Sequence, residues 1–380
     1  MRETVIAGIG IVPFGVYDGT PHYVLATAAI RSALKDSGFE WRDIQAAFCG
    51  SVYQGTGSGH QALREIGLMG MPVINNENAC SSSAVSLRSA YQAVAAGIYD
   101  IVIAVGFEKM PRGPIASTAF RDWQLKMGMN IQPGNYALET VEYMHQYGVS
   151  IDDISRVTIK NRKNASMNPN ARFRTAVDME TINASRIIAS PLRLYHCAPI
   201  ADGAACAIVC TKEKAKELSR CVTVAASQLL SCEHGQQDMT NGMPASVKHK
   251  PKEHCIAKCA RLAYEAAGIG PEDINVAQVY DSMAPAELWH AELLGFCGYG
   301  EAPRLLREGH FDIGGKLPTN TDGGLMGRGH PLGATGMAQI CEIVAQLRGE
   351  AGPRQVEKAR IGLTHAMGAG PNTCITILKK

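Results

Sequence analysis

The sequence predicts an α/β fold with a mostly parallel sheet that helices cover on both faces. Strand and helix signals alternate in the N-terminal part of the chain, with strands expected at 4–12, 46–49 and 101–106 and helices at 24–37 and 82–96. The composition of 39 glycines and only 6% aromatic residues is typical of closely packed α/β layers. A similar order of elements returns near the C-terminus, so two related halves are expected.

The C-terminal repeat consists of four successive signals. They are a strand at 276–280, a glycine-rich stretch at 322–327, a helix at 334–347 and a strand at 360–365. Further strands are expected at 204–210 and 222–229, before a linker at 242–251. Within the first half, the polar and Met-rich region 111–194 predicts an inserted loop domain over a cleft, with an amphipathic helix at 151–165. We expect a first half at 1–245, which includes this insertion, and a second half at 246–380.

Composition excludes several function classes. The net charge is +2, from 37 basic and 35 acidic residues, which makes nucleic acid an unsuitable partner. No apolar run approaches the roughly 18 residues of a membrane span. Without a secretory context, the 12 cysteines are interpreted as reduced thiols of a cytoplasmic protein. His254, Cys255 and Cys259 lack a second ligand pair at zinc spacing, so no metal site is expected.

Cys80 is the candidate nucleophile. It stands in the segment Asn78-Ala79-Cys80-Ser81, between an apolar, β-rich run and the expected helix at 82–96. Unpaired N–H groups and the positive end of the helix dipole favour a thiolate there, and thiols so placed reach pKa values of roughly 3.5 to 7.5. A buried, inert cysteine is the more common reading of one thiol among twelve. The surroundings of Cys80 favour the reactive one.

Two histidines accompany this thiol at glycine-rich junctions. His330 lies in Gly329-His330-Pro331, and His365 ends the strand expected at 360–365. Glycines at such junctions allow a thioester to approach the backbone and free N–H groups to bind an oxyanion. Either histidine alone would be read as an ordinary surface or core residue. Their shared setting makes both of them candidates for proton transfer.

Five segments resemble thiolases, specifically the sterol-carrier-protein or lipid-transfer type of bacteria and archaea. They are NENACSSSA at 76–84, GFEKM at 106–110, CAPIADGAACAIV at 197–209, APAELWHAELLGFC at 284–297 and GGLMGRGHPLGATGMAQI at 323–340. The resemblance spans nearly the whole chain. It implies duplicated βαβαβαββ halves in a five-layer αβαβα arrangement, in which two mixed sheets enclose paired buried helices, with the inserted loop domain and a tight dimer.

The resemblance also implies the chemistry. Cys80 would attack an acyl-CoA thioester with His330 as general base, and a second group would move a proton at the α-carbon of the other acyl-CoA. CoA and acyl-CoA are then substrates, and no bound cofactor is expected. One oxyanion hole would lie near His330. Another would use the N–H of Cys80 with N–H groups of the turn from Gly368 to Gly370.

The departures from the family pattern concern the second thiol. Where thiolases place a Cys-x-Gly motif near the C-terminus, this chain has His365, and where sterol-carrier-type thiolases carry His-Asp-Cys-Phe, it has Tyr280-Asp281-Ser282-Met283. Both usual sources of the second thiol are therefore missing. Asp281 is retained, Ser282 and Met283 become candidate substrate-binding residues, and His365 or Tyr280 becomes the candidate proton-transfer group. A pocket-wall ring is the alternative reading of Tyr280.

Other functions remain open at this point. A decarboxylating ketoacyl synthase also uses one cysteine and two histidines, but its usual His-Gly-Thr-Gly signature is absent. A retro-aldol lyase acting on a β-hydroxyacyl-CoA would not need an acyl-cysteine, and Tyr280 keeps this reading open. The third alternative is a non-catalytic CoA-binding subunit. The subgroup also implies a homodimer and a small zinc-ribbon and OB-fold partner protein that helps to bind CoA.

Overall fold

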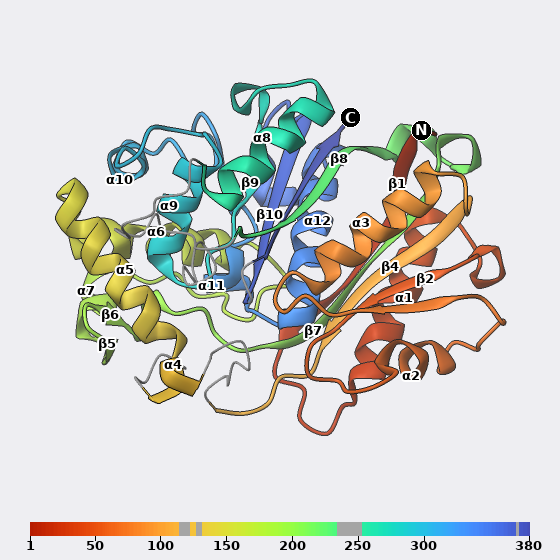
Figure 1. The fold of residues 1–380 in the computed structure, drawn as a ribbon, viewed down its shortest axis with the longest axis horizontal. Coiled ribbons are helices and arrows are strands. Elements are labelled where there is room, and N and C mark those ends of the chain that lie inside the picture. The colour runs from red at the N-terminus through yellow and green to blue at the C-terminus, as the bar shows by residue number, and fades with distance from the viewer. Residues whose placement is uncertain (114–121, 127–130, 234–252, 370–371) are drawn as a thin grey trace.

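The computed structural model describes residues 1–113, 122–126, 131–233, 253–369 and 372–380, and the statements below concern these residues. Helices cover the outer faces of one large sheet, and further helices lie between its two halves (Figure 1). The strands are β1 (Thr4–Gly15), β2 (Ala47–Gly50), β3 (Val73–Asn76), β4 (Ile101–Glu108), β5 (Ile187–Ala189), β6 (Leu192–Arg193), β7 (Asp202–Thr211), β8 (Val222–Ser231), β9 (Val276–Gln278), β10 (Ile361–Gly368) and β11 (Asn372–Lys379).

The helices follow the small-residue and amphipathic stretches of the sequence. They are α1 (His22–Ser37), α2 (Ser58–Arg64), α3 (Ser82–Ala95), α4 (Asp122–Lys126), α5 (Gln132–Tyr147), α6 (Ile151–Ser166), α7 (Met179–Ala184), α8 (Cys255–Ala267), α9 (Ala284–Leu293), α10 (Ala302–Arg307), α11 (Gly324–Arg328) and α12 (Leu332–Arg348). Each helix and strand that the sequence predicts by range is present, within a few residues. The linker expected at 242–251 lies outside the described residues.

The sheet contains the same arrangement twice. Its strand order is β3-β2-β4-β7-β1-β8-β11-β10-β9. In the first half β2 runs parallel to β4, which pairs antiparallel with β7, which pairs antiparallel with β1. In the second half β9, β10, β11 and β8 repeat these directions in the same order. The expectation of a mostly parallel sheet is therefore wrong, because hydrophobic runs do not encode strand direction.

The two halves meet at their first strands. β1 pairs with β8 only at Val5–Thr223 and Ile6–Val222, so this seam is short. The second copy of the repeat accordingly begins at β8, which precedes the boundary at residue 246 expected from the sequence. We propose that the halves divide between β7 and β8.

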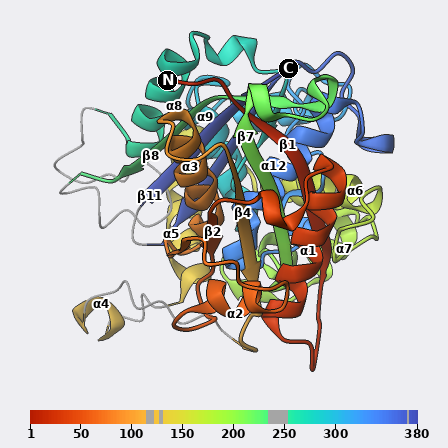
Figure 2. The ribbon, with the colours of Figure 1, turned by 90° about the vertical axis from the view of Figure 1, so that its right-hand side faces the viewer.

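Three apolar layers give the stacking order of the fold. One lies between α1 and the outer face of the first-half strands, and includes Ile30 and Ile103. A second surrounds α3 and α12, which pack against each other and against strands of both halves, and includes Leu87 and Ile340. The third lies under α8 and α9 and includes Trp289. Figure 1 shows α3 and α12 side by side at the centre, and Figure 2 shows α1 covering the outer face.

The insertion between β4 and β7 crosses to the second half. Helices α5 and α6 contact α9, and α6 also contacts α10 and α11 (Figure 1). Ser150 caps α6 in a reciprocal capping box with Asp153. The amphipathic helix predicted at 151–165 is thus confirmed. Its position brings side chains of the first half against the segment that follows β9.

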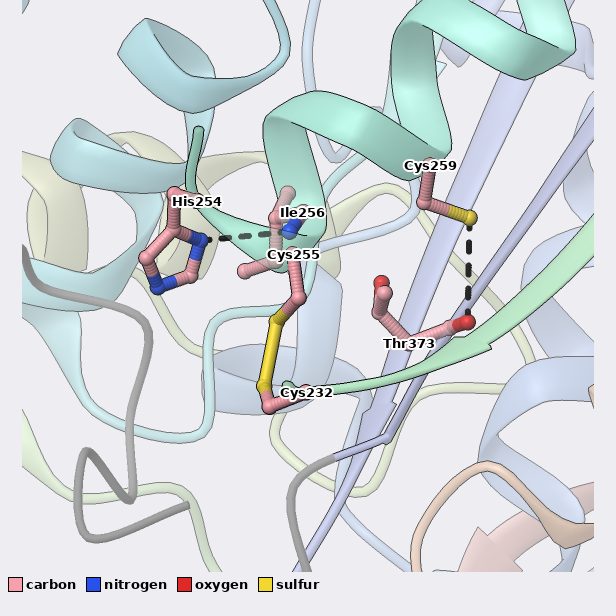
Figure 3. Close-up of a disulfide and its surroundings, with 6 residues drawn as sticks. All are labelled: Cys232, His254, Cys255, Ile256, Cys259 and Thr373. Atoms are coloured by element: carbon pink, nitrogen blue, oxygen red, sulfur yellow. Dashed lines mark hydrogen bonds between the residues drawn. A yellow bond between two sulfur atoms is a disulfide. The ribbon is translucent and has the colours of Figure 1, made fainter. Parts of the chain in front are cut away.

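The cysteines are not all free thiols. Cys232, just after β8, and Cys255, the first residue of α8, form a disulfide with their Cα atoms 5.2 Å apart (Figure 3). The prediction that all 12 cysteines are reduced is wrong for this pair, because the fold brings two segments 23 residues apart into contact. Cys259 turns its thiol toward the carbonyl of Thr373 at 3.8 Å (Figure 3). In the described ranges, no cluster of three or more His, Cys, Asp or Glu residues is arranged to hold a metal ion.

None of the helices in the described part of the chain has both the length and the apolar character that a membrane span requires.

The contact between α3 and α12 generates a stability prediction. A Cβ atom at Gly336 would lie 2.8 Å from the Cβ atom of Ala84 and 2.9 Å from its backbone nitrogen. We expect Gly336→Ala to destabilise the protein by about 1–3 kcal/mol, measured as a lower urea midpoint, because the two central helices must separate. Gly134→Ala, in α5 with nothing within 4 Å of the added atom, is the control and should not lower the midpoint. Equal midpoints for the two variants would show that the central layer tolerates expansion.

Candidate active site

The loop before α3 presents Cys80. Ala79 has a φ of 50°, a left-handed conformation that costs a non-glycine residue about 1–2 kcal/mol. Two serine hydroxyls fix this turn: Ser82 accepts a hydrogen bond from the N–H of Asn78 and donates to the carbonyl of Ala79, and Ser81 lies 2.5 Å from the side-chain oxygen of Asn372. The strained turn is therefore held from both halves of the fold, and Cys80 projects from it.

The Cys80 thiol is a weaker acid than the sequence predicts. Burial raises its pKa to about 11, with a further increase from the negative charge of Glu108. Hydrogen bonds from Tyr280 and from the backbone N–H groups of Ala369 and Cys80 itself act in the opposite direction. The expected lowering of the pKa is wrong, because the loss of hydration outweighs the donors at the start of α3. The resting group is a thiol.

His330 is oriented as a hydrogen-bond acceptor. Its Nδ1 lies 2.7 Å from the hydroxyl of Thr335, and that hydroxyl donates its own hydrogen to the carbonyl of Pro331. Nδ1 must then carry the proton, which leaves Nε2 free to accept one. Burial and the nearby Arg328 guanidinium lower the pKa of His330 to about 3. The ring is therefore neutral, as a general base must be.

Tyr280 connects the thiol to the imidazole. Its hydroxyl lies 3.3 Å from Nε2 of His330, and hydrogen bonding with Cys80 raises its pKa while hydrogen bonding with Ser282 lowers it. The side chain is 5% exposed, and burial raises its pKa well above the ordinary value. The structure thus brings three predicted site residues, Cys80, His330 and Tyr280, to one point.

Asp281 points away from the sulfur. Its carboxylate accepts hydrogen bonds from the N–H groups of Leu325 and Met326, at the start of α11, and from Asn161. Burial and the negative charge of Glu287 raise its pKa. Because α11 ends at Arg328, just before His330, Asp281 holds the histidine segment in place. We propose that Asp281 positions this segment, and its expected catalytic role stays a prediction.

His365 lies deeper, in a cluster of imidazoles. Its ring packs edge-on against His290, with centroids 4.8 Å apart, and neither ring nitrogen has a hydrogen-bond partner among the described residues. Burial, with a contribution from His290 and His254, lowers its pKa well below the ordinary value. Ala369, whose N–H reaches Cys80, is four residues further along, about 13 Å at the usual strand rise. The structure does not bring His365 to the thiol.

Of the remaining predicted residues, Gly368 meets the loop of the nucleophile through its backbone. A Cβ at Gly368 would lie 2.2 Å from the carbonyl of Asn78, so only glycine permits the strand to approach the nucleophile loop. Gly370 lies outside the described residues. Met283 is buried and pairs with Cys197 in an isolated bridge. The backbone carbonyl of Ser282 accepts a hydrogen bond from the N–H of Ala198. The described backbone contact of Met283 is thus with Cys197 and not with the thiol of Cys80.

Two contributors were missed in the sequence. Glu108, within the GFEKM segment, accepts hydrogen bonds from the N–H groups of Val52, Tyr53 and Gly333, and burial raises its pKa to about 7. It ties β4 to the loop that carries His330, and the motif itself was the available signal. Tyr136 of α5 places its hydroxyl 2.7 Å from that of Ser282. No local pattern marks Tyr136, because the packing of the insertion decides its position.

Known proteins share this architecture along the whole chain. Residues 4–213 match the family model "Thiolase, N-terminal domain", and residues 240–380 match "Thiolase C-terminal domain-like". The chain is 37% identical to an acetyl-CoA acetyltransferase of Methanothermobacter thermautotrophicus, covering 98% of both chains. It is 35% identical to benzoylsuccinyl-CoA thiolase subunit BbsB of Thauera aromatica, covering 97% of this chain and 95% of that protein. Sterol carrier protein 2 of Bos taurus is 33% identical, with 100% of this chain and 72% of that protein covered.

Solved structures agree with these relatives. One described as "Ltp2-ChsH2(DUF35) aldolase" has a TM-score of 0.86 at 28% identity, over 99% of this chain and 97% of that one. Human mitochondrial 3-ketoacyl-CoA thiolase has a TM-score of 0.75 at 16% identity, over 100% and 99%, and shows the shared fold. The chain belongs to the thiolase family. It is an enzyme of the acyl-CoA C-acyltransferase class, and thiolases act on CoA thioesters without an additional cofactor.

The protonation states of the site generate a pH prediction. With the pKa of Cys80 raised to about 11 and that of His330 lowered to about 3, the resting pair is a neutral thiol and a neutral imidazole. We expect the rate of Cys80 alkylation by iodoacetamide to rise continuously with pH from 6 to about 10, as the thiolate fraction grows. Mass spectrometry would follow the label, with Cys80→Ser as the control. A plateau between pH 6 and 9 would instead indicate a thiolate–imidazolium pair.

Proposed function

We propose that this thiolase cleaves a 3-oxoacyl-CoA with CoA, or catalyses the reverse Claisen condensation, through a thioester on Cys80. The single observation that carries this proposal is the shared contact of the Tyr280 hydroxyl with Cys80 and with Nε2 of His330. Through this contact, a proton can pass from Cys80 to the neutral imidazole of His330 and, by way of Tyr280, to the space in front of the sulfur. Thiolysis is the favoured direction, because Claisen condensation is thermodynamically uphill.

The first half-reaction balances with one proton. The Cys80 sulfur attacks the 3-oxo carbonyl carbon, and His330 Nε2 receives the thiol proton. The bond between the carbonyl carbon and the α-carbon breaks, and its electron pair remains on the enolate of the departing acyl-CoA. Tyr280 donates its hydroxyl proton to that α-carbon and recovers a proton from His330. The proton of the thiol thus ends on carbon.

The second half-reaction regenerates the thiol. His330 Nε2 removes the proton of the CoA thiol, and the CoA sulfur attacks the acyl group on Cys80. The thioester bond to the enzyme breaks, and the released Cys80 sulfur takes that proton from His330. The N–H groups of Cys80 and Ala369 both reach the sulfur, which supports the role of these donors in an oxyanion hole for the acyl oxygen. Tyr280 rather than His365 is the proposed acid and base at carbon, because of these two side chains only that of Tyr280 interacts with the thiol.

The test of this proposal is the intact mass of the enzyme after brief exposure to a panel of 3-oxoacyl-CoAs. We expect an added acyl mass on Cys80, none in Cys80→Ala, and a loss of turnover of about 10²–10⁴-fold in His330→Gln and in Tyr280→Phe. Tyr264→Phe is the matched control, because the Tyr264 hydroxyl donates to the carbonyl of Leu294, just after the C-terminal end of α9. This variant should keep its activity. Full turnover in Cys80→Ala would exclude an acyl-enzyme.

A second candidate function is a retro-aldol cleavage of a β-hydroxyacyl-CoA. A phenol beside the sulfur favours it, and the structure described as an aldolase matches this chain at a TM-score of 0.86. This reaction needs a base for the β-hydroxyl but no acyl-cysteine. If it operates here, Cys80→Ala should still release an aldehyde or ketone from a β-hydroxyacyl-CoA, detected by hydrazone formation, and Tyr280→Phe should not. Loss of cleavage in Cys80→Ala would count against this function.

The assembly and location of the protein are further proposals. We propose a cytoplasmic homodimer that takes part in lipid metabolism, which the family resemblance and ten free cysteines support. We also propose a small zinc-ribbon and OB-fold partner. The matched structure carries a DUF35 component in its description. On α5, Leu138 and Val141 are 70% and 53% exposed and share one face, which supplies an apolar surface suited to a second protein.

A further inference from the structure

A line of hydroxyl groups continues from the sulfur into the insertion. Hydrogen bonding with Cys80 and with Ser282 shifts the pKa of Tyr280, and the Ser282 hydroxyl lies 2.7 Å from the hydroxyl of Tyr136. All three hydroxyl-bearing residues are buried, with Tyr136 4% exposed and Ser282 9% exposed. The line therefore runs from the loop between β9 and α9, which holds Tyr280 and Ser282, to α5, with Tyr136 as its last described member.

Packing fixes the outer end of this line. The ring of Tyr136 stacks on Trp289 of α9 at a centroid distance of 6.2 Å and an interplanar angle of 11°. Trp289 also meets Tyr143 edge-on at 5.9 Å. Helix α5 is thus docked on α9 by aromatic contacts, and the Tyr136 hydroxyl has little freedom to leave Ser282. This arrangement puts a phenol of the insertion into the polar network of the active site.

We propose that Tyr136 and Ser282 are positioning residues that orient the Tyr280 hydroxyl and stabilise its phenolate while the α-carbon exchanges a proton. This inference rests on the proposed function and deepens it. Ser282 occupies the place where the resemblance expects the second catalytic thiol. In the proposed arrangement the Ser282 hydroxyl does not act on substrate: it donates to the Tyr280 oxygen while it accepts from Tyr136. One donor, polarised by the hydroxyl behind it, therefore points at the forming negative charge.

The charges around this line make such donors necessary. The charges of Glu139, Cys80 and Asp281 all raise the pKa of Tyr136, and those of Cys80 and Tyr136 raise the pKa of Tyr280. Hydrogen bonding from Ser282 lowers the pKa of Tyr280. Ser282 is therefore the side chain of this line that counters the unfavourable burial of a phenolate, and Tyr136 orients it.

The experiment measures two steps of one enzyme separately. Exchange of the methyl protons of acetyl-CoA with D₂O reports proton transfer at carbon, and the acyl mass on Cys80 reports nucleophilic attack. We expect Tyr136→Phe and Ser282→Ala to slow the exchange by about tenfold to a hundredfold, the effect of one hydrogen bond to a charged group, with acylation little changed. The pH at which exchange reaches half its limiting rate should move upward, because the phenolate loses donors.

The controls separate orientation from folding. Tyr143→Phe removes another buried phenol hydroxyl of α5, one that donates to Glu292, and should leave exchange unchanged. Ser282→Cys keeps a weak donor and should recover part of the lost rate. In the double variant, Tyr136→Phe should add little to Ser282→Ala, because Tyr136 acts through Ser282. Circular dichroism of each variant verifies its fold.

Distinct results would overturn the inference and the proposed function. Exchange and pH profile equal to the wild type in both Tyr136→Phe and Ser282→Ala, or fully additive losses in the double variant, would overturn the positioning role. A loss that is independent of pH and equal for acylation and exchange would indicate only a structural role and would also overturn it. If the wild type neither acylates Cys80 nor exchanges protons, the proposed function itself fails.

Discussion

The contact of one buried phenol with both a thiol and an imidazole is the interaction on which the proposed chemistry depends. Tyr280 reaches Nε2 of His330 at 3.3 Å and bonds Cys80 as well. Burial keeps all three groups neutral at rest, since it raises the pKa of the thiol and of the phenol and lowers that of the imidazole. Charge then appears only when substrate is attacked, at the point where the donors converge.

The duplicated fold explains why these groups meet. Cys80 comes from the first half, before α3, while His330 precedes α12 and Tyr280 follows β9 in the second. Helices α3 and α12 pack together between the strands of both halves, and the N–H of Met337 near the start of α12 donates to the hydroxyl of Ser83 at the start of α3. The N-terminal ends of the two helices therefore lie on the same side of the molecule. Gly368 allows β10 to approach the loop before Cys80, and Asp281 holds α11 in front of His330. Each half thus completes the site of the other.

The sequence predicts the parts of this arrangement that short motifs encode. The α/β class, most elements and the nucleophile, base and phenol follow from local residues and from the family resemblance. Strand direction, the Cys232–Cys255 pair and the placement of Tyr136 do not, because they depend on contacts between segments far apart in the chain. The predicted lowering of the Cys80 pKa is wrong for a related reason. A helix terminus is visible in the sequence, but the loss of hydration around a buried sulfur is not.

Replacement of the second thiol changes what the protein must provide. An ordinary thiol has a pKa near 8.5 and a phenol one near 10, so a phenol needs more assistance to act as a base at neutral pH. Burial increases that difference for Tyr280, whereas donors directed at its oxygen reduce it. Ser282 supplies such a donor from the position that a thiol would occupy, and the insertion supports it through Tyr136. In the proposed mechanism, a phenol whose acidity depends on its neighbours replaces a thiol acting alone, and the inserted helix α5 supports that phenol through Tyr136.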